Sequence, residues 1–168
     1  MTAQRATIVF AVLVTLVPVA LAQVDWDRSV DFGTYHTFGF RSGTPANRLV
    51  QDRIETAVRE TLRDKGLKET DTPELWVVTH VSMTAERWVS STTPGYRGFR
   101  GSVGATSINV SEIPIGSLMI DLVDGERDEL VWRGTTRATP KKSPEKSEKQ
   151  IRKRVDKLFR DFPPQDKK

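Results

Sequence analysis

Two segments of this chain carry a single apolar stripe at helical spacing, and each stripe can be buried on one side only. The stripes are Val50, Ile54, Ala57, Val58 and Leu62 in the first segment, and Ile151, Val155, Leu158 and Phe162 in the second. The other faces of both segments are polar. Each helix therefore needs a flat apolar surface to cover, which one face of a β-sheet provides.

Local signals place the ends of both helices. The pair Thr44-Pro45 is suited to cap the first helix and open its first turn, and Lys65-Gly66 to end it. Ser143-Pro144 predicts the start of the second helix in the same way. That helix is expected to end at Phe162-Pro163-Pro164, because proline cannot continue it.

Strand-like segments fill the rest of the chain in an order that argues against a doubly wound sheet. They are residues 24–28, 35–40, 75–88, 107–113, 116–123 and 129–136. Four of them follow one another without an intervening helix, so a mostly antiparallel sheet is expected. The fold class predicted is α+β, a two-layer sandwich with both helices packed on one face of the sheet. The first half of the strand from Leu75 is apolar at consecutive positions, which predicts burial on both of its sides.

The register of the last hairpin can be predicted from its apolar pattern. Pairing Val123 with Glu129 sets Leu122 opposite Leu130 and Ile120 opposite Trp132, all on one face. The same register brings Asp121 diagonal to Arg133 on the other face, where they are expected to form an ion pair.

The first 22 residues have the pattern of a secretory signal peptide. A single charge, Arg5, precedes an apolar run from Ala6 to Leu16, and Ala20-Leu21-Ala22 supplies small residues for cleavage near Ala22-Gln23. An uncleaved anchor is the alternative. The chain has no cysteine, which argues against a lipoprotein and excludes disulfides. We expect an exported chain, periplasmic or secreted, with one domain over residues 23–164 and a disordered tail at 165–168.

A long loop is predicted over residues 89–106, because serine, threonine and glycine replace the strand pattern there. The residues considered for binding are Trp88 at the strand end and Tyr96, Arg97, Phe99 and Arg100 within the loop. Aromatic and cationic groups on such a loop suit an envelope protein or a glycan as partner. Export makes nucleic acid an improbable partner, and a disordered loop without a binding role is the alternative.

Basic residues concentrate at the C-terminal end. Residues 141–168 contain 11 Lys/Arg and 5 Asp/Glu, although the whole chain has a net charge of only +4. The cations of the last helix are Lys149, Arg152, Lys153, Arg154, Lys157 and Arg160. A weak contact with an anionic membrane surface is one interpretation, and a solvated helix face is the other.

Motifs for catalysis or metal binding do not stand out in the sequence, and no cofactor is expected. Asp25, Asp27, Ser29 and Asp31 have the spacing of the first calcium-loop ligands, but Val30 and His36 occupy positions that require Gly and Glu. A zinc site completed from His36 and His80 by Asp121 or Asp124 lacks cysteine ligands. No nucleophile elbow or phosphate-binding loop is present. Carboxylates that converge only in the fold remain the one enzymatic alternative.

Particular residues resemble the bacterial DUF4136 family, a domain of unknown function. The segments that carry the resemblance are Asp25-Trp26-Asp27, Asp31-Phe32, Tyr35, Thr37-Phe38, residues 116–124, residues 130–135 with Trp132, Arg133 and Gly134, Leu158-Phe159 and Phe162-Pro163-Pro164. The resemblance implies a secreted or lipid-anchored envelope protein with no defined catalytic residues. The missing lipobox cysteine departs from many relatives and puts membrane tethering in doubt.

The function expected is that of a non-enzymatic binding or scaffold module of the cell envelope. One alternative is a hydrolase that acts on an envelope glycan or peptide. Another is peripheral docking on anionic membrane through the basic C-terminal helix.

Overall fold

A computed structural model describes residues 22–44, 47–92 and 107–164 of the chain. The elements are β1 (Gln23–Trp26), the 3-10 helix η1 (Phe32–Thr34), β2 (Thr37–Thr44), α1 (Arg48–Asp64), β3 (Lys68–Glu69), β4 (Leu75–Thr92), β5 (Ser107–Asp124), β6 (Leu130–Ala138) and α2 (Pro144–Leu158). The expected tail at 165–168 and the centre of the expected loop lie outside the described residues.

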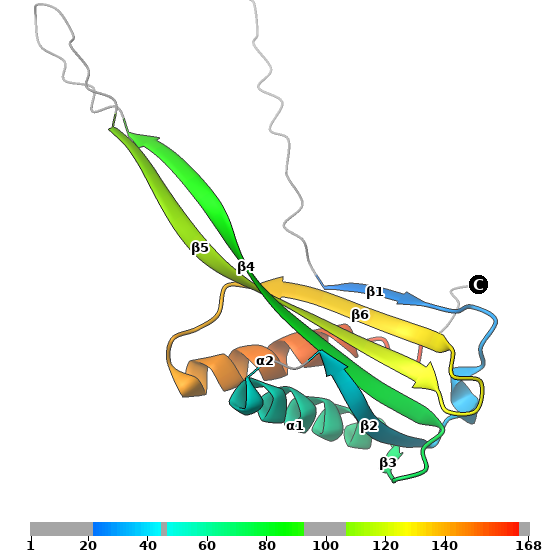
Figure 1. Ribbon diagram of the computed structural model, residues 1–168. Coiled ribbons are helices and arrows are strands. Elements are labelled where there is room, and N and C mark those ends of the chain that lie inside the picture. Colours follow the sequence, from blue (N-terminus) through cyan, green and yellow to red (C-terminus); the bar gives the residue numbers. More distant parts are fainter. Residues whose placement is uncertain (1–21, 45–46, 93–106, 165–168) are drawn as a thin grey trace, which may run out of the picture.

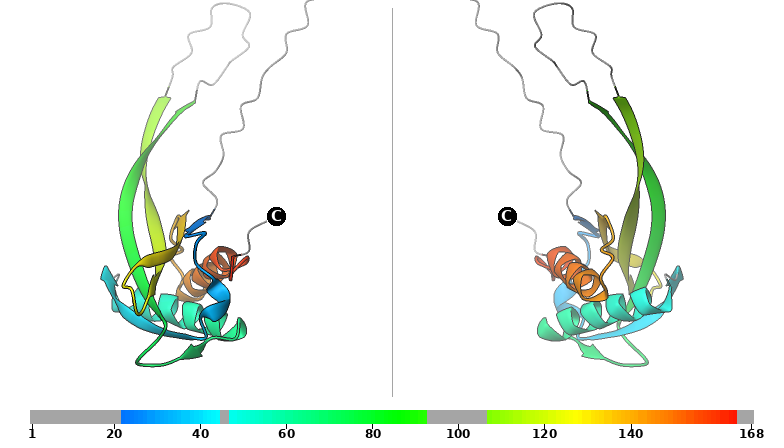
Figure 2. Two further views of the ribbon diagram at one scale, coloured as in Figure 1. Left: turned by 90° about the vertical axis from the view of Figure 1, so that its right-hand side faces the viewer. Right: turned by 90° about the vertical axis from the view of Figure 1, so that its left-hand side faces the viewer.

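A six-stranded open sheet and two helices form two layers, as the apolar stripes predict. The strand order is β1-β6-β5-β4-β2-β3, and only the pairings of β2 with β3 and with β4 are parallel. Both helices lie on the same face of the sheet (Figures 1 and 2). The α+β two-layer class is therefore confirmed.

The core lies between that face and the helices. Sheet residues such as Leu75, Val77 and Ile120 are fully buried against Val58 and Leu62 of α1. Burying an aliphatic side chain of this size contributes about 1.5–3 kcal/mol. The sheet thus gives each helix the flat apolar surface that its stripe requires.

The C-terminal residues close this core with aromatic rings. Trp132 of β6 stacks on Phe159, with ring centroids 4.6 Å apart, and Phe162 meets both rings edge-on. Gly134 lies beside this stack, and a Cβ there would come within 2.5 Å of the Trp132 ring. The glycine and the tryptophan of the family signature are therefore coupled by packing.

The start of α1 differs from the prediction. Thr44 is the last residue of β2, and the helix is capped by Asn47, whose Oδ1 accepts the N–H of Val50 at 3.0 Å. Thr44 is held in the strand by pairing with His80 of β4, a long-range contact that its local sequence does not indicate. The predicted end is correct, because Gly66 follows with a positive φ of 92°.

The hairpin of β5 and β6 has a different register from the predicted one. Leu122 lies opposite Trp132 and Ile120 opposite Gly134, because an irregularity between Leu122 and Val123 shifts the pairing. Leu130 is consequently exposed rather than buried. Asp121 lies directly opposite Arg133, and the expected ion pair forms with two hydrogen bonds of 2.7 Å.

The outer face of β4 is more open than predicted. Trp76 and Val78, which point away from the helices, are half-buried, so the expectation of burial on both sides is wrong. Among residues 22–44, 47–92 and 107–164, no second layer covers that face of the sheet (Figure 2).

The strands β4 and β5 are longer than the sequence suggests. Each has 18 residues, and they pair without interruption from Leu75 with Asp124 to Thr92 with Ser107. Residues 89–92, expected in the loop, are therefore strand, and the expected break between residues 113 and 116 does not exist. The pairing partner supplies the hydrogen bonds that a Ser- and Thr-rich segment lacks by itself.

The far half of these two strands leaves the sheet as an arm, defined here as residues 82–92 and 107–115. The last partners of β4 and β5 within the sheet are Thr44, paired with His80, and Ala138, paired with Gly116. Beyond these points the arm is a twisted two-stranded ribbon that projects away from both layers (Figures 1 and 2). It is the part of the described chain most accessible to a partner.

Candidate functional site

The arm exposes large apolar side chains. Those with at least about three-fifths of their surface exposed are Met83 59%, Trp88 63%, Val89 62%, Ile108 67% and Val110 60%. Met83 lies at the base of the arm on β4, and the other four lie farther out along it. Monomers seldom gather such residues on one projection, and an exposed apolar cluster commonly marks an interaction site.

Strand alternation divides the arm into two faces. The face that continues the core side of the sheet carries Val89, Val110 and Ile108, because these follow Leu75 and Val77 at even intervals or pair with such residues. The opposite face carries Trp88, together with the half-buried Ile113 and Ile115. Each face therefore has its own apolar residues.

Salt bridges hold the arm in place along its length. Arg87 pairs with Glu112 across the two strands at 3.6 Å. Glu86 pairs with Arg137 of β6, which ties the base of the arm to the body of the sheet. Exposed pairs of this kind contribute little stability, so they orient the arm more than they fold it.

The structure places only part of the predicted binding set. Trp88 is on the arm, 63% exposed. Tyr96, Arg97, Phe99 and Arg100 lie outside the described residues. The apolar residues Val89, Ile108 and Val110 were not predicted as site residues, since a strand that faces solvent on both sides has the same apolar alternation as a buried one.

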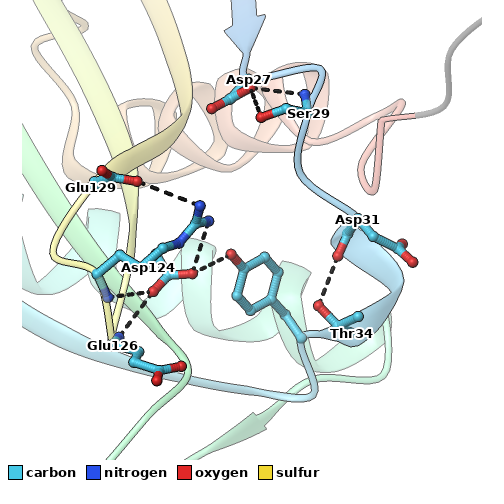
Figure 3. A network of polar contacts seen from close by, with 9 residues as sticks. Asp27, Ser29, Asp31, Thr34, Asp124, Glu126 and Glu129 are labelled. Atoms are coloured by element: carbon cyan, nitrogen blue, oxygen red, sulfur yellow. Dashed lines mark hydrogen bonds and ion pairs between the residues drawn. The ribbon is translucent and has the colours of Figure 1, made fainter.

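A polar network joins the turn between β5 and β6, at the end of β5 farthest from the arm, to the N-terminal segment (Figure 3). The Asp124 carboxylate accepts hydrogen bonds from the Tyr35 hydroxyl at 2.6 Å and from the backbone N–H groups of Glu126 and Arg127 at 2.9 and 2.7 Å. The Arg127 guanidinium lies 3.2 Å from the same carboxylate and 3.4 Å from Glu129. These contacts fix the turn between β5 and β6.

The electrostatics of this network follow from its hydrogen bonds. Burial alone would raise the pKa of Asp124, but the bonds from Tyr35, Arg127 and Glu126 outweigh it and lower the pKa to about 2. Burial, followed by the bond to Asp124, raises the pKa of Tyr35 to about 12. At neutral pH the aspartate is charged and the tyrosine is neutral, so the hydrogen bond between them is maintained.

Several carboxylates converge on a small cleft beside the network. It has a volume of about 360 Å³, and Asp31, Glu74, Asp124 and Glu126 line it. Glu74 accepts the N–H groups of His36 and Thr37, and the first of these bonds lowers its pKa. A general acid must hold a proton near neutral pH, and neither Asp124 nor Glu74 does so here.

The two histidines contact different residues in separate parts of the structure. His36 is near Glu74, whereas His80 contacts Thr44 at 3.0 Å and lies 3.7 Å from Asp121 on the open face of the sheet. Asp121 already accepts two hydrogen bonds from Arg133. Over residues 22–44, 47–92 and 107–164, no three His, Asp or Glu side chains gather as metal ligands would.

The carboxylates that have calcium-loop spacing accept hydrogen bonds from neighbouring residues of the chain. Asp27 accepts hydrogen bonds from the N–H and hydroxyl groups of Ser29 (Figure 3). The side chain of Asp31 accepts the N–H of Gly33 at the start of η1. Asp25 lies on β1 opposite Arg133 of β6. These residues shape the link from β1 to β2.

The remaining signature residues have structural positions. Phe32 and Phe162 are buried and pack edge-on, with ring centroids 5.8 Å apart. Pro163 follows Phe162 through a cis peptide bond. The residues that carry the resemblance therefore lie where the N-terminal segment, the hairpin and the end of α2 meet, and none of them lies in the arm.

Comparison with known proteins supports this assignment of the fold. The model of a family described as "Domain of unknown function (DUF4136)" matches residues 22–164. No curated protein matches the chain in sequence. Within the described part of the chain, no helix is long and apolar enough to span a membrane.

Solved structures with a similar fold include a PDZ domain protein from Parabacteroides distasonis ATCC 8503, at 17% sequence identity and a TM-score of 0.60. The match covers 87% of this chain and 36% of that protein, so the chain spans about a third of its length. A PelC dodecamer from Paraburkholderia phytofirmans matches at 13% identity and a TM-score of 0.45, over 82% of this chain and 95% of PelC. The likeness to the PDZ domain protein shows a similar fold and nothing further.

Proposed function

Because the chain belongs to the DUF4136 family, whose function is unknown, we propose that it is an exported binding or scaffold module of the bacterial cell envelope. The arm is its contact surface. The proposal of export comes from the leader pattern of residues 1–22.

The arm is the observation that carries this proposal. A two-stranded ribbon in water is marginally stable alone, and this one extends beyond every neighbouring strand with five large apolar side chains exposed. It adds nothing to the core, since none of its described residues is fully buried. A binding role explains both the length of the ribbon and the apolar residues on it.

The catalytic alternative has less support. Its best location is the cleft beside Asp124, where Asp124 and Glu74 accept hydrogen bonds from backbone N–H groups that lower the pKa of each. Those groups stabilise turns and strand ends. We therefore favour binding over hydrolysis.

Site-specific photo-crosslinking in cells tests the proposal. A photoreactive residue replaces Trp88 on the arm, and a matched control replaces Leu49 at the start of α1, which is exposed to a similar extent, 67% against 63%. We expect irradiation to join position 88, and not position 49, to a defined envelope component identified by mass spectrometry. Equal labelling from both positions, or none from position 88, would contradict an arm-mediated contact.

A further inference from the structure

A second cleft, separate from the arm and from the network at Asp124, lies between the N-terminal strand and the end of α2. Val24 and Trp26 of β1 line one side of it, and Leu158 and Pro163, at the end of α2 and just after it, line the other. The edge strand β1 runs beside this end of the helix (Figures 1 and 2). The space, called here the β1–α2 cleft, has a volume of about 940 Å³. That volume is within the range of small-molecule sites, roughly 300–1,000 Å³.

The floor of the β1–α2 cleft is apolar. Trp132 and Leu158 line it and are only 1% and 2% exposed, since they belong to the core. Val24 and Trp26 are half-buried and pack against that core. An apolar chain laid in the cleft would contact all four side chains and would itself leave water, which favours binding.

Three cations line the same cleft, and they come from two separate segments. Arg28 follows β1, Lys157 lies in the last turn of α2, and Arg160 lies just beyond the helix. None of the three forms an ion pair within residues 22–44, 47–92 and 107–164. The dipole of α2 explains basic side chains at its C-terminal end, but it does not explain Arg28. The cations are exposed or half-buried, so they lie toward the mouth of the cleft.

The balance of charge favours a ligand with a single negative charge. Asp161 also lines the cleft, so one carboxylate stands against the three cations. The C-terminal end of a helix adds about half a negative charge, which leaves the mouth positive. Arginine binds a carboxylate through two parallel hydrogen bonds, and lysine adds a compact charge. The mouth therefore suits the head group of a monoanion.

From the apolar floor and the cationic mouth together, we propose that the β1–α2 cleft binds a long-chain fatty acid. The acyl chain lies against Val24 and Trp26, and the carboxylate meets Arg28, Lys157 and Arg160. A neutral chain would leave these cations without a partner, and a small polar anion would leave the floor in contact with water. This site is separate from the arm, and the proposal goes beyond the function assigned to the arm.

Quenching of tryptophan fluorescence by dibromostearate tests the proposal, because bromine quenches an indole ring that it contacts. Trp26 lies in the cleft, whereas Trp88 lies on the exposed arm. We expect dibromostearate, kept below its micelle concentration, to quench the chain from Gln23 onward in a saturable way. Trp26→Phe should remove much of the quenching, and Trp88→Phe should leave it. Dibromostearyl alcohol, which has no charge, should bind about ten-fold more weakly.

A charge-removing variant and its matched control test the head-group contacts. Arg28→Gln/Lys157→Gln removes two cations from the mouth and leaves the floor intact, so its affinity for dibromostearate should fall about ten-fold while that for the alcohol changes little. Lys149→Gln/Lys153→Gln makes the same change in net charge on exposed side chains of α2 that do not line the cleft. This control should bind as the original chain does. Circular dichroism of each variant establishes that the fold is intact.

Several outcomes would overturn the proposal: quenching that does not saturate, equal affinity for the acid and the alcohol, or quenching that is lost in Trp88→Phe instead of Trp26→Phe. Capture by phosphatidylglycerol vesicles without binding of the free acid would also reject it, in favour of a membrane surface. The crosslinking test at position 88 is independent. A chain that crosslinks there and does not bind the fatty acid keeps the proposed function and loses this site.

Discussion

Two buried aspartates, Asp121 and Asp124, stabilise the β5–β6 hairpin in different ways. Asp121 is paired with an arginine on the neighbouring strand, whereas Asp124 accepts bonds from its own turn and from Tyr35, 89 residues earlier in the chain. The first contact is predictable, because strand alternation puts Asp121 and Arg133 on one face. The second requires the fold, because nothing near Tyr35 in the sequence indicates its partner.

Replacement of Asp124 by asparagine should reduce stability at neutral pH by about 2 kcal/mol, because the pKa of this group falls from 3.8 in the unfolded chain to about 2 in the folded chain. The ionised form is the one favoured in the folded state. Its contribution is therefore complete above about pH 4 and is lost as the pH falls toward about 2. Urea unfolding at several pH values, followed by tryptophan fluorescence, measures the difference.

The two proteins should converge in stability as the solution is acidified through this window. Glu126→Gln, in the same turn, serves as control, since the contact of Glu126 with Asp124 is made by its backbone N–H. A constant gap between the original chain and Asp124→Asn at all pH values would show that the charge of Asp124 does not contribute.

At the scale of elements, the sequence predicts the helices better than the strands. Each helix depends mainly on its own apolar spacing, and both stripes face the core as expected, with Val50 and Ile151 half-buried. The predicted end of the second helix at Phe162-Pro163-Pro164 is wrong, because α2 ends at Leu158 and Phe162 packs on the core from beyond the helix. Strand ends depend on a partner far along the chain. The segment Val89–Ser91 has loop-like composition, yet it is strand because residues 108–110 pair with it.

The two helix starts form a natural comparison. Asn47 accepts the N–H of Val50, whereas Ser143 occupies the cap position of α2 without a side-chain hydrogen bond. We expect Asn47→Ala to cost about 1 kcal/mol and Ser143→Ala clearly less, since only the first loses a capping bond. Equilibrium denaturation of both variants measures this, and equal losses would show that the Asn47 cap does not stabilise α1.

At the scale of the whole molecule, the layers are predictable and the arm is not. Helix stripes and strand order indicate a two-layer sandwich, because each apolar face must be covered. The arm begins where the neighbouring strands β2 and β6 end, at Thr44 and Ala138, and β4 and β5 continue beyond them. No local pattern in β4 or β5 marks that point.

Removal of the arm should leave the body of the protein folded. A chain that joins Met83 to Gly116 through an Asn-Gly turn keeps the pairing of these two residues and every buried residue of the core. We expect its thermal midpoint to lie within a few degrees of the original. Loss of cooperative unfolding would instead show that the arm is part of the folding unit.

The single proline of the arm bears on whether further strands can add to its edge. Pro114 pairs with Ala85 of β4, in a stretch of β5 beyond its pairing with β6. A proline has no backbone N–H, so it cannot donate a hydrogen bond to an added strand at this edge. Long bare strand edges are where chains add to one another into fibres. With β5 obstructed at this point, a molecule that carries an exposed apolar ribbon has one fewer route to open-ended polymers.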